Sequence, residues 1–600
     1  MARKPEQGKR RAAFESGLGT DVLAITGFEA QEEINQLFEM RIDAVSDQKN
    51  IDFNKVLGTK CAVRINTTDE QKRYFNGTLV EAYSLGQAKD VYSYRVILRP
   101  WLWLLTKTSN CRIFKQKNVK DIIAEVLNKH SFASFEDRTS GSFPALEYCV
   151  QYCESDFHFI CRLMEEYGIY YFFDHSQGDH KLIIADSISA HKPKFGGADT
   201  SFVPYSEKHF QNKETLNEWI NARQFCSGTF AYGDYNYLKP DMSLLVEKSA
   251  SNSYQNGALE VYHYPGRYEE KSDGNTKVGA WMEAEQALDQ RCRASGDVVS
   301  CSPGGKLKLQ GNPQVADGTE FLILGAKHVY RAPHYLSEPD ELEDSYNGQF
   351  EFLPVKVPFR PLTRTSKPRI VGPQTAFVVG DGEIDVDEHG RIEVKFHWAK
   401  DRDLVQSRRV RISHGWSGAS WGDIKIPRVG MEVVVEFLNG DPDQPLVTGT
   451  VYNGNNATPY DLPADKTISG VKSKTDGGDG YNELIFDDRD GNELIRFHAE
   501  RDLEGKVEND ERRDVGHNVN VKIGNNRTEN IGMEWSAEAG TRIEFKCGQS
   551  TIVMTPASIE IKSVSITVSA SANLVAKGSA MTNVESSGPT IVKGAIITLN

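Results

Sequence analysis

The chain has 600 residues and a formal net charge of −14, with 39% hydrophobic and 26% charged residues. This length predicts a globular protein of about four domains, and the acidic balance argues against nucleic acid as a partner, because phosphate contacts are made chiefly by Lys and Arg. Nine cysteines are spread from Cys61 to Cys547. An odd, scattered set is not a disulfide framework and indicates folding in a reducing cytoplasm.

The N-terminal segment, residues 1–19, is basic and contains no apolar stretch, so we expect a tail and no secretory signal peptide. The longest conspicuous apolar cluster, residues 101–105, is far too short to span a bilayer. We therefore expect the protein in the cytoplasm of the cell that makes it. If it leaves that cell, a dedicated machine must carry it, because we expect no signal peptide.

The first large region, residues 20–370, is predicted to be mainly strands with a few helices. Strands are expected over 22–25, 38–45, 61–65, 77–83, 92–98, 169–173 and 181–185. The spacing of apolar residues predicts one helix over 119–130, a second that begins behind Ser155 as N-cap and runs to Gly168, and a third over 277–294. Residues 338–369, acidic at first and then rich in Pro and basic residues, have the composition of a connector.

A compact all-β unit is predicted over residues 371–462. Its five short strands are expected over 391–398, 408–413, 423–426, 432–438 and 446–452, which fits an OB-type Greek-key barrel. Trp398, Trp416 and Trp421 would suit a stacking platform for single-stranded nucleic acid. However, residues 380–452 hold nine Lys or Arg against thirteen Asp or Glu, so we interpret these tryptophans as core or subunit contacts.

The last region, residues 463–600, changes character. After Phe545 no aromatic residue occurs, and pairs of apolar residues recur every seven to nine positions, at 543/545, 552/554, 559/561, 566/568 and 574/576. Each pair alternates as in a half-buried strand, so the spacing predicts a β-helix with one short strand per turn. A thin array of this kind buries too little apolar surface to offset about 1–2 kcal/mol of backbone entropy per residue. We therefore expect several identical chains to wind together into a stiff needle.

Two glycine motifs suggest chemistry but lack the context that the chemistry needs. Residues 418–422, with Ser420 at the centre, match the G-x-S-x-G nucleophile elbow of α/β-hydrolases. That elbow needs a helix after the serine, and a strand is predicted there instead. Residues 477–482 resemble one calcium-binding RTX repeat, and a single copy favours a plain Gly-rich turn.

A cluster of possible metal ligands also lacks the arrangement that its chemistry needs. Its members are Cys149, Cys153, His158 and Cys161. Their spacing is not the paired spacing of zinc ribbons, and buried thiols are the commoner explanation. Carboxylates are too plentiful for the sequence to exclude a glycosidase pair. We predict no catalytic residue, no cofactor and no metal.

Several long, ordered segments resemble one family. Residues 148–157, YCVQYCESDF, and 165–173, EEYGIYYFF, closely resemble a hallmark of VgrG, the spike proteins of type VI secretion systems. The predicted barrel matches equally well in five segments, 390–391, 396–398, 421–422, 426–430 and 440–445. RPWLW at 99–103 and YNEL at 481–484 match as well. The chain is identified from these segments as a member of the VgrG family.

The resemblance implies a homotrimer with a phage-hub-like base of two β-barrel subdomains over 20–370. An OB-fold neck over 371–462 and a triple-stranded β-helix needle over 463–600 would follow. Such a spike sits on an Hcp tube and contacts baseplate proteins. It carries a PAAR-repeat tip protein and effectors with their adaptor chaperones, and it touches the target-cell membrane transiently as it punctures the envelope. No lysozyme-like insertion follows the barrel and no effector domain precedes Asn600, so we expect a spike and carrier without enzyme activity.

Apolar side chains crowd the last turn of the predicted needle, and they are Ile591, Val592, Ile596, Ile597 and Leu599. Threefold symmetry would present them three times on a blunt end with open strand edges, which is typical of a binding surface. We expect the PAAR-type protein to bind there. Two alternatives stay open, which are a phage or phage-like tail spike of the same architecture and a spike with a hidden peptidoglycan-hydrolase activity.

Overall fold

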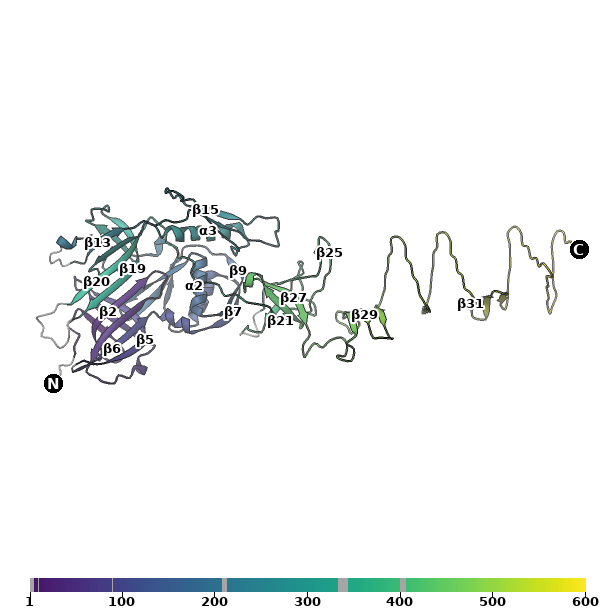
Figure 1. The fold of residues 1–600 in the computed structure, drawn as a ribbon, viewed down its shortest axis with the longest axis horizontal. Helices are drawn as coiled ribbons and strands as arrows, with labels where there is room; N and C mark the ends of the chain where they lie inside the picture. Colours follow the sequence, from purple (N-terminus) through teal and green to yellow (C-terminus); the bar gives the residue numbers. More distant parts are fainter. Residues whose placement is uncertain are drawn as a thin grey trace. The chain divides into compact units, whose positions relative to one another are not determined.

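The computed structural model describes residues 5–8, 10–88, 90–207, 213–332, 344–399 and 406–599. Parts of the expected tail and connector, residues 1–4, 9 and 338–343, lie outside these ranges. The chain divides into two compact units, residues 1–502 and 503–600. Over the described residues it is mainly β, with three α-helices, as the sequence predicts (Figure 1).

The first unit contains a twelve-stranded sheet in the order β1-β4-β5-β6-β3-β2-β19-β18-β12-β13-β17-β20. Its strands are β1 Ala12–Glu15, β2 Ala24–Glu33, β3 Glu39–Ser46, β4 Lys60–Asn66, β5 Lys72–Ala88, β6 Val91–Arg99, β12 Asp199–Phe202, β13 Thr215–Asn221, β17 Cys292–Gly296, β18 Lys306–Gln310, β19 Thr319–Arg331 and β20 Ser345–Pro354. The five strands expected between residues 22 and 98 are present as β2 to β6. Residues 12–15, expected to belong to a tail, instead pair with β4 and bury Phe14.

Half of this sheet closes into a barrel. Strand β20 pairs with both β17 and β19, so β19, β18, β12, β13, β17 and β20 form a ring. Closure removes free strand edges, and the interior is filled by apolar side chains that include Trp219, Phe321 and Phe352. The second half of β19 pairs with β2, so one long strand joins this barrel to strands β1–β6.

Two helices cover the other half of the sheet. Helix α1 spans Val119–Asn128, and helix α2 spans Asp156–Glu166. The Ser155 hydroxyl accepts a hydrogen bond from the His158 amide at 3.1 Å, which confirms the predicted N-cap. The apolar face of α1 is buried in the largest core together with the 3₁₀ helix η2, Trp101–Lys107. Strands β7, Asn110–Asn118, and β9, Ala145–Glu154, form a separate antiparallel pair beside these helices.

Smaller sheets complete the base. They are β8 Phe135–Asp137, β10 Tyr170–Ser176 and β11 Asp179–Ala185 in one sheet, and β14 Thr229–Tyr232, β15 Val246–Ser249 and β16 Glu260–His263 in the other. Helix α3, Lys271–Gln286, packs against the second sheet through Trp281, whose ring stacks on Tyr232. The prediction of a helix over 277–294 is wrong at both ends. Ala294 lies in β17 between partners on β13 and β20, because closing the barrel requires a strand there.

The OB-type barrel follows. Its five-stranded sheet has the order β22-β21-β26-β27-β23, with β21 Gln374–Val379, β22 Glu393–Phe396, β23 Arg411–Ile412, β26 Glu432–Phe437 and β27 Pro445–Val451. Strand β21 was not predicted. Residues 423–426, predicted to be a strand, form no strand. The Asp423 amide donates to the Trp416 carbonyl at 2.9 Å, but Ile424 is exposed and Pro427 has no N–H to donate. A short hairpin of β24, Ser417–Gly418, and β25, Trp421–Gly422, precedes them.

A three-stranded sheet ends the first unit, with β28 Ile468–Lys472, β29 Glu483–Asp487 and β30 Leu494–His498. Strands β29 and β30 pair as an antiparallel hairpin. Three 3₁₀ turns besides η2 lie in the base, and a fourth follows β26: η1 Phe53–Lys55, η3 Ile188–Ala190, η4 Tyr205–Glu207 and η5 Leu438–Gly440. None of the helices in the described ranges is both long and apolar enough to cross a bilayer.

The second unit, residues 503–600, is a series of extended segments with almost no interior (Figure 1). Its assigned strands are β31 Ile543–Cys547, β32 Ser550–Met554 and β33 Ile559–Lys562. An eight-residue repeat, missed in the sequence analysis, places Val515, Ile523, Ile531, Ala539 and Cys547 each directly before a glycine. Within one chain a Cβ on any of these five glycines, at 516, 524, 532, 540 and 548, would meet no atom within 4 Å.

Candidate functional site: the ionic junction between the base and the OB-type barrel

The OB-type barrel rests on the β7–β9 pair of the base. On β9 the Val150 amide donates to Asp443 Oδ1 at 2.7 Å, and the Tyr152 hydroxyl accepts from Gln374 Nε2 at 2.8 Å. On β7 the Lys115 ammonium donates to the Ser407 carbonyl at 2.9 Å. The side chains of Tyr152 and Ile113 also pack against the apolar core of the barrel. Strand β9 is thus the main seat of the barrel.

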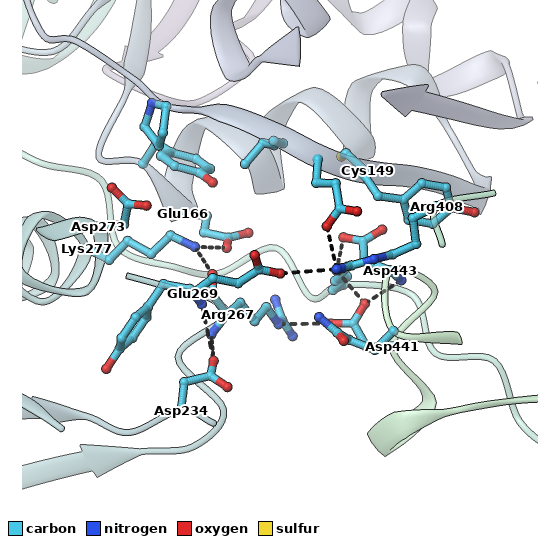
Figure 2. A pocket seen from close by; sticks show the side chains of 18 of the residues that line it. Cys149, Glu166, Asp234, Arg267, Glu269, Asp273, Lys277, Arg408, Asp441 and Asp443 are labelled. Carbon is cyan, nitrogen blue, oxygen red and sulfur yellow. Dashed lines mark hydrogen bonds and ion pairs between the residues drawn. The ribbon is translucent and has the colours of Figure 1, made fainter. Parts of the chain in front are cut away.

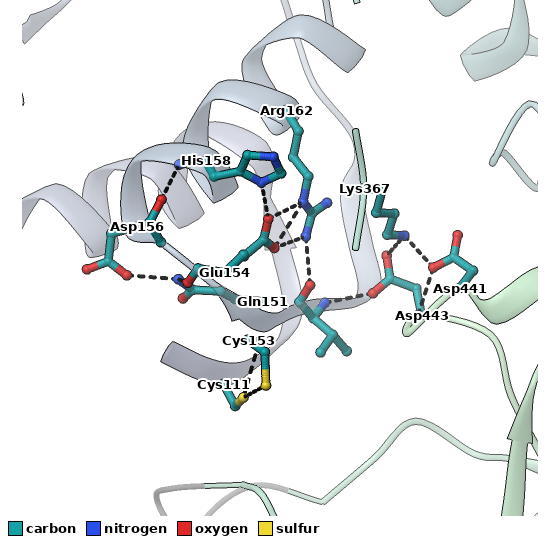
Figure 3. A network of polar contacts seen from close by, with 12 residues as sticks. Cys111, Gln151, Cys153, Glu154, Asp156, His158, Arg162, Lys367, Asp441 and Asp443 are labelled. Atoms are coloured by element: carbon teal, nitrogen blue, oxygen red, sulfur yellow. Dashed lines mark hydrogen bonds and ion pairs between the residues drawn. The ribbon is translucent and has the colours of Figure 1, made fainter. Parts of the chain in front are cut away.

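A buried lysine from the connector lies at the centre of this contact. Lys367 is only 5% exposed, and its ammonium lies 2.5 Å from Asp441 Oδ1 and in contact with Asp443 (Figure 3). Burial disfavours its charge, but the carboxylates of Asp443 and Asp441 outweigh burial and raise the pKa of Lys367 above its usual value. One cation thus holds together the two aspartates of the GDPDQP segment.

A second ion pair fixes the same strand from the side of α2. The Arg162 guanidinium binds Glu154 through two nitrogens, with distances of 2.7–3.1 Å, and donates to the Val150 carbonyl at 2.8 Å. Burial opposes the guanidinium charge, yet Glu154 raises the pKa of Arg162. The backbone of Val150 is therefore held at both of its polar groups, by Asp443 at its N–H and by Arg162 at its carbonyl (Figure 3). This residue links helix α2 to the barrel.

A cavity of about 180 Å³ lies beside the junction, and half of the residues that line it are charged (Figure 2). In it Lys277 donates to Glu166 Oε1 at 2.7 Å and to the Arg267 carbonyl at 2.6 Å. Burial would raise the pKa of Glu166, but Lys277 and further cations lower it to about 2. Arg267 reaches Asp441 at 3.3 Å, and Arg408 pairs with glutamates of the base. The cavity is therefore a network of ion pairs.

The EEYGIYYFF segment supplies much of this junction. Glu165 accepts hydrogen bonds from the Arg364 and Thr365 amides at 2.8 and 2.7 Å, which fastens the connector to the end of α2. Gly168 has a φ of 68°, and a Cβ there would lie 2.8 Å from the Ala280 Cβ on α3. Only glycine fits both that backbone and that approach. The sequence predicted the helix end and the strand of this segment, but not its contacts with the connector and with α3.

The three tryptophans singled out in the sequence have different positions. Trp398 stacks on Phe396 and meets Tyr152 edge to face, and its indole N–H donates to Gln374 Oε1 at 2.9 Å. Trp416 and Trp421 contact each other on the β24–β25 hairpin but are 66% and 56% exposed. They do not lie in the core of one chain, so their assignment as subunit contacts stays a prediction.

The catalytic alternatives lack the required geometry in the described residues. Ser420 sits in the β24–β25 turn with a φ of 65° and is followed by no helix, unlike the serine of a nucleophile elbow. In the Gly-rich loop, the Gly477 amide donates to Glu383 Oε2 at 3.2 Å, as expected of a plain turn tied to the barrel.

The four residues weighed as zinc ligands are not gathered around a point. Cys149 and Cys161 are buried, His158 bonds Glu154 at 2.8 Å, and Cys153 contacts Cys111 instead. Burial raises the pKa of Cys149 well above its usual value, so this thiol of the cavity wall is a poor nucleophile. No cluster of three or more metal-binding side chains is found in the parts of the chain described.

The predicted tip residues Ile591, Val592, Ile596, Ile597 and Leu599 are exposed in the single chain. Most side chains of the second unit are equally exposed, so exposure alone does not distinguish them as a binding site.

Three family descriptions match successive parts of the chain. Residues 31–333 match the phage tail baseplate hub (GPD). Residues 374–452 match the type VI secretion system/phage-baseplate injector OB domain, and residues 469–577 match the bacteriophage T4 gp5 C-terminal trimerisation domain. The junction described above therefore joins a hub-like base to an injector-type OB domain.

The identity with curated relatives shows to which family the chain belongs. The spike protein VgrG1a of Pseudomonas aeruginosa is 34% identical over 566 residues, which cover 89% of this chain and 88% of the relative. VgrG1b of the same organism is 36% identical over 519 residues, covering 85% and 70%. The chain belongs to the VgrG family of type VI secretion spike proteins. A solved Francisella PdpA–VgrG complex has the same fold, with a TM-score of 0.53 at 11% identity over 79% of this chain and 76% of that one.

Within this VgrG-family chain, the acidic and basic residues of the junction were not predicted from the sequence. Lys367 lay in a segment interpreted as a connector, and Asp441 and Asp443 were quoted only as part of a matching segment. The available signal was the position of Arg162 and Glu166 on a helix that is otherwise mostly apolar.

Proposed function

We propose that this VgrG-family chain works as a homotrimeric spike that sits on an Hcp tube and baseplate. It carries a PAAR-type tip and effector proteins, and it punctures the target-cell envelope during contractile injection. The observation that carries the proposal is the second unit, because residues 503–600 repeat apolar residues and glycines along the chain and bury almost none of them.

A single chain of this kind has no core to offset its conformational entropy and leaves its strand edges open. Three chains wound together would cover both the apolar side chains and the open edges. The glycines of the eight-residue repeat support this, because no atom of the same chain would lie within 4 Å of a Cβ placed on them. The match of residues 469–577 to a trimerisation domain supports three as the number of chains.

We place the PAAR-type tip on Ile591, Val592, Ile596, Ile597 and Leu599. These residues lie beyond the segment that matches the trimerisation domain, and they bring many apolar side chains into a short stretch. Three copies of this stretch would form an apolar patch, which a cap protein would cover.

Cargo binding is supported by the Francisella structure, in which a VgrG protein is found in complex with PdpA. Cytoplasmic production followed by export without a signal peptide is supported by the type VI relatives and by nine cysteines that are all free thiols. No enzymatic step is assigned to this chain. Replacing Ser420 with Ala should leave secretion intact, and an ester or glycan hydrolysis that disappears with this change would contradict the assignment.

The proposed function is tested by secretion and tip capture in the native cell. The wild-type chain should appear in the culture medium together with an Hcp and a PAAR protein when the sheath is functional. A pull-down analysed by mass spectrometry should identify these partners and the cargo. Secretion that is unaffected by loss of this chain, with no such partner in the pull-down, would overturn the proposal.

A further inference from the structure

Two cysteines meet at the seat of the OB-type barrel. Cys111 of β7 and Cys153 of β9 have their sulfur atoms 3.3 Å apart, and the Cys153 amide donates to the Cys111 sulfur at 3.2 Å (Figure 3). The other seven cysteines of the chain make no sulfur–sulfur contact, and six of them are buried. This pair is therefore distinct from the scattered thiols of the chain.

The local backbone explains why the two side chains meet. In the antiparallel pairing of β7 and β9, Asn110 lies opposite Glu154 and Arg112 lies opposite Gln151. Cys111 therefore faces two residues, Tyr152 and Cys153, which is the pattern of a β-bulge. Cys153 has a φ of 47°, in the left-handed region that bulges use to redirect a side chain. The Tyr152 hydroxyl binds Gln374 of the barrel, and the Cys153 sulfur contacts Cys111 instead.

The pair is accessible. Cys153 is exposed, and both cysteines line an open recess of about 450 Å³ whose wall also includes His397 and Trp398 of the barrel. A small thiol or disulfide reagent can enter a space of this size. Cys153 is the more exposed of the two, and burial, with the contact to Cys153, raises the pKa of Cys111 to about 11, so Cys153 is better placed to attack first.

We propose that Cys111 and Cys153 form a reversible dithiol–disulfide site that reacts with external disulfides. The Cys153 thiolate attacks one sulfur of the external disulfide, forms a mixed disulfide and releases the first thiolate. The Cys111 thiolate then attacks the Cys153 sulfur, closes the intramolecular bond and releases the second thiolate. Two protein thiols lose two protons and two electrons, and the external disulfide gains them as two thiols.

The bond would fasten β7 to β9 next to the residues that hold the barrel. Cys153 lies between Tyr152, which binds Gln374, and Glu154, which binds Arg162. Oxidation would therefore lock the seat of the barrel when the protein passes from a reducing to an oxidising compartment. The chemistry of the site does not depend on the proposed function, because it requires only an external disulfide.

The test uses the purified full-length protein and glutathione disulfide. After equilibration and acid quenching, Cys111 and Cys153 should both have lost their free thiols, and the peptide pair that contains them should be lighter by about 2 Da and carry no glutathione. Peptide mapping without reduction should find Cys111 joined to Cys153. A Cys547→Ser variant, which removes the other exposed thiol, should still lose two thiols.

The Cys111→Ser variant should stop at the mixed disulfide and keep one glutathione on Cys153. The peptide map of the wild-type chain stands without any variant, so a variant that fails to fold does not affect the result. Unchanged thiol content, glutathione retained on wild-type Cys153, or disulfides formed elsewhere would each overturn the proposal.

Discussion

Replacing Lys367 with Met should open the junction between the base and the OB domain. The change keeps an unbranched side chain, shorter by one atom, but leaves Asp441 and Asp443 buried next to each other without their shared cation. Removing one partner of a buried ion pair typically costs about 3–5 kcal/mol, because the remaining charge is uncompensated. Every 1.4 kcal/mol is a factor of ten, so exchange through opening of this contact should accelerate about 10²- to 4 × 10³-fold.

The assay is hydrogen exchange of the peptides that contain Val150 and Asp443, whose hydrogen bond reports the contact directly. A global unfolding temperature is less suitable because a chain with several domains need not unfold in one step. Lys425→Met is the matched control, since Lys425 pairs with Asp423 at 3.3 Å on the exposed surface of the same domain and should change little.

The double variant Lys367→Met with Asp443→Asn should recover part of the protection. It removes one of the two stranded charges, while the Asn oxygen can still accept from the Val150 amide. Equal, small effects of Lys367→Met and Lys425→Met would refute the view that buried charges hold this junction.

Three further outcomes are expected. Trp398→Ala should destabilise the OB domain by about 3 kcal/mol in denaturant unfolding, whereas Trp421→Ala should leave this domain folded because the ring is exposed; equal losses would contradict these positions. Burial lowers the pKa of His328 to about 4 and of His180 to about 3, against 6.5 unfolded. The unfolded chain therefore binds more protons below pH 6.5, and the unfolding midpoint of the base should fall between pH 6.5 and 4, with a shallower fall in His328→Gln; a flat profile would count against it. Deleting residues 594–600 should leave the oligomer intact but abolish co-purification of the PAAR-type protein, and retention of that protein would place its site elsewhere.

The sequence predicted best the elements that depend on residues close together in the chain. Helices α1 and α2 were located to within a few residues because their apolar spacing and the Ser155 cap are short-range signals. The end of α3 was missed because Ala294 belongs to β17, and the closure of the barrel, which involves β13 and β20, is not visible in a local window. Strand β1 was missed for the same reason, since its partner β4 lies about fifty residues away.

The junction was harder to predict than the fold. Segments such as EEYGIYYFF and GDPDQP identified the family, but a buried ion pair and a solvated charge look alike in sequence. Lys367 and Asp443 are 76 residues apart, and only the folded chain brings them together. The pair of Cys111 and Cys153 depends on a β-bulge, and no spacing rule predicted it.

The mass of the purified protein in solution tests the central claim most directly. Light scattering after size exclusion should give three times the chain mass of 67.1 kDa, which is about 201 kDa. Ile523→Asp with Ile531→Asp should lower the trimer fraction by placing charges in the apolar repeat, whereas Asn525→Asp, between them, should not. A stable species of 67.1 kDa at micromolar concentration, with residues 503–600 resistant to protease, would contradict the account.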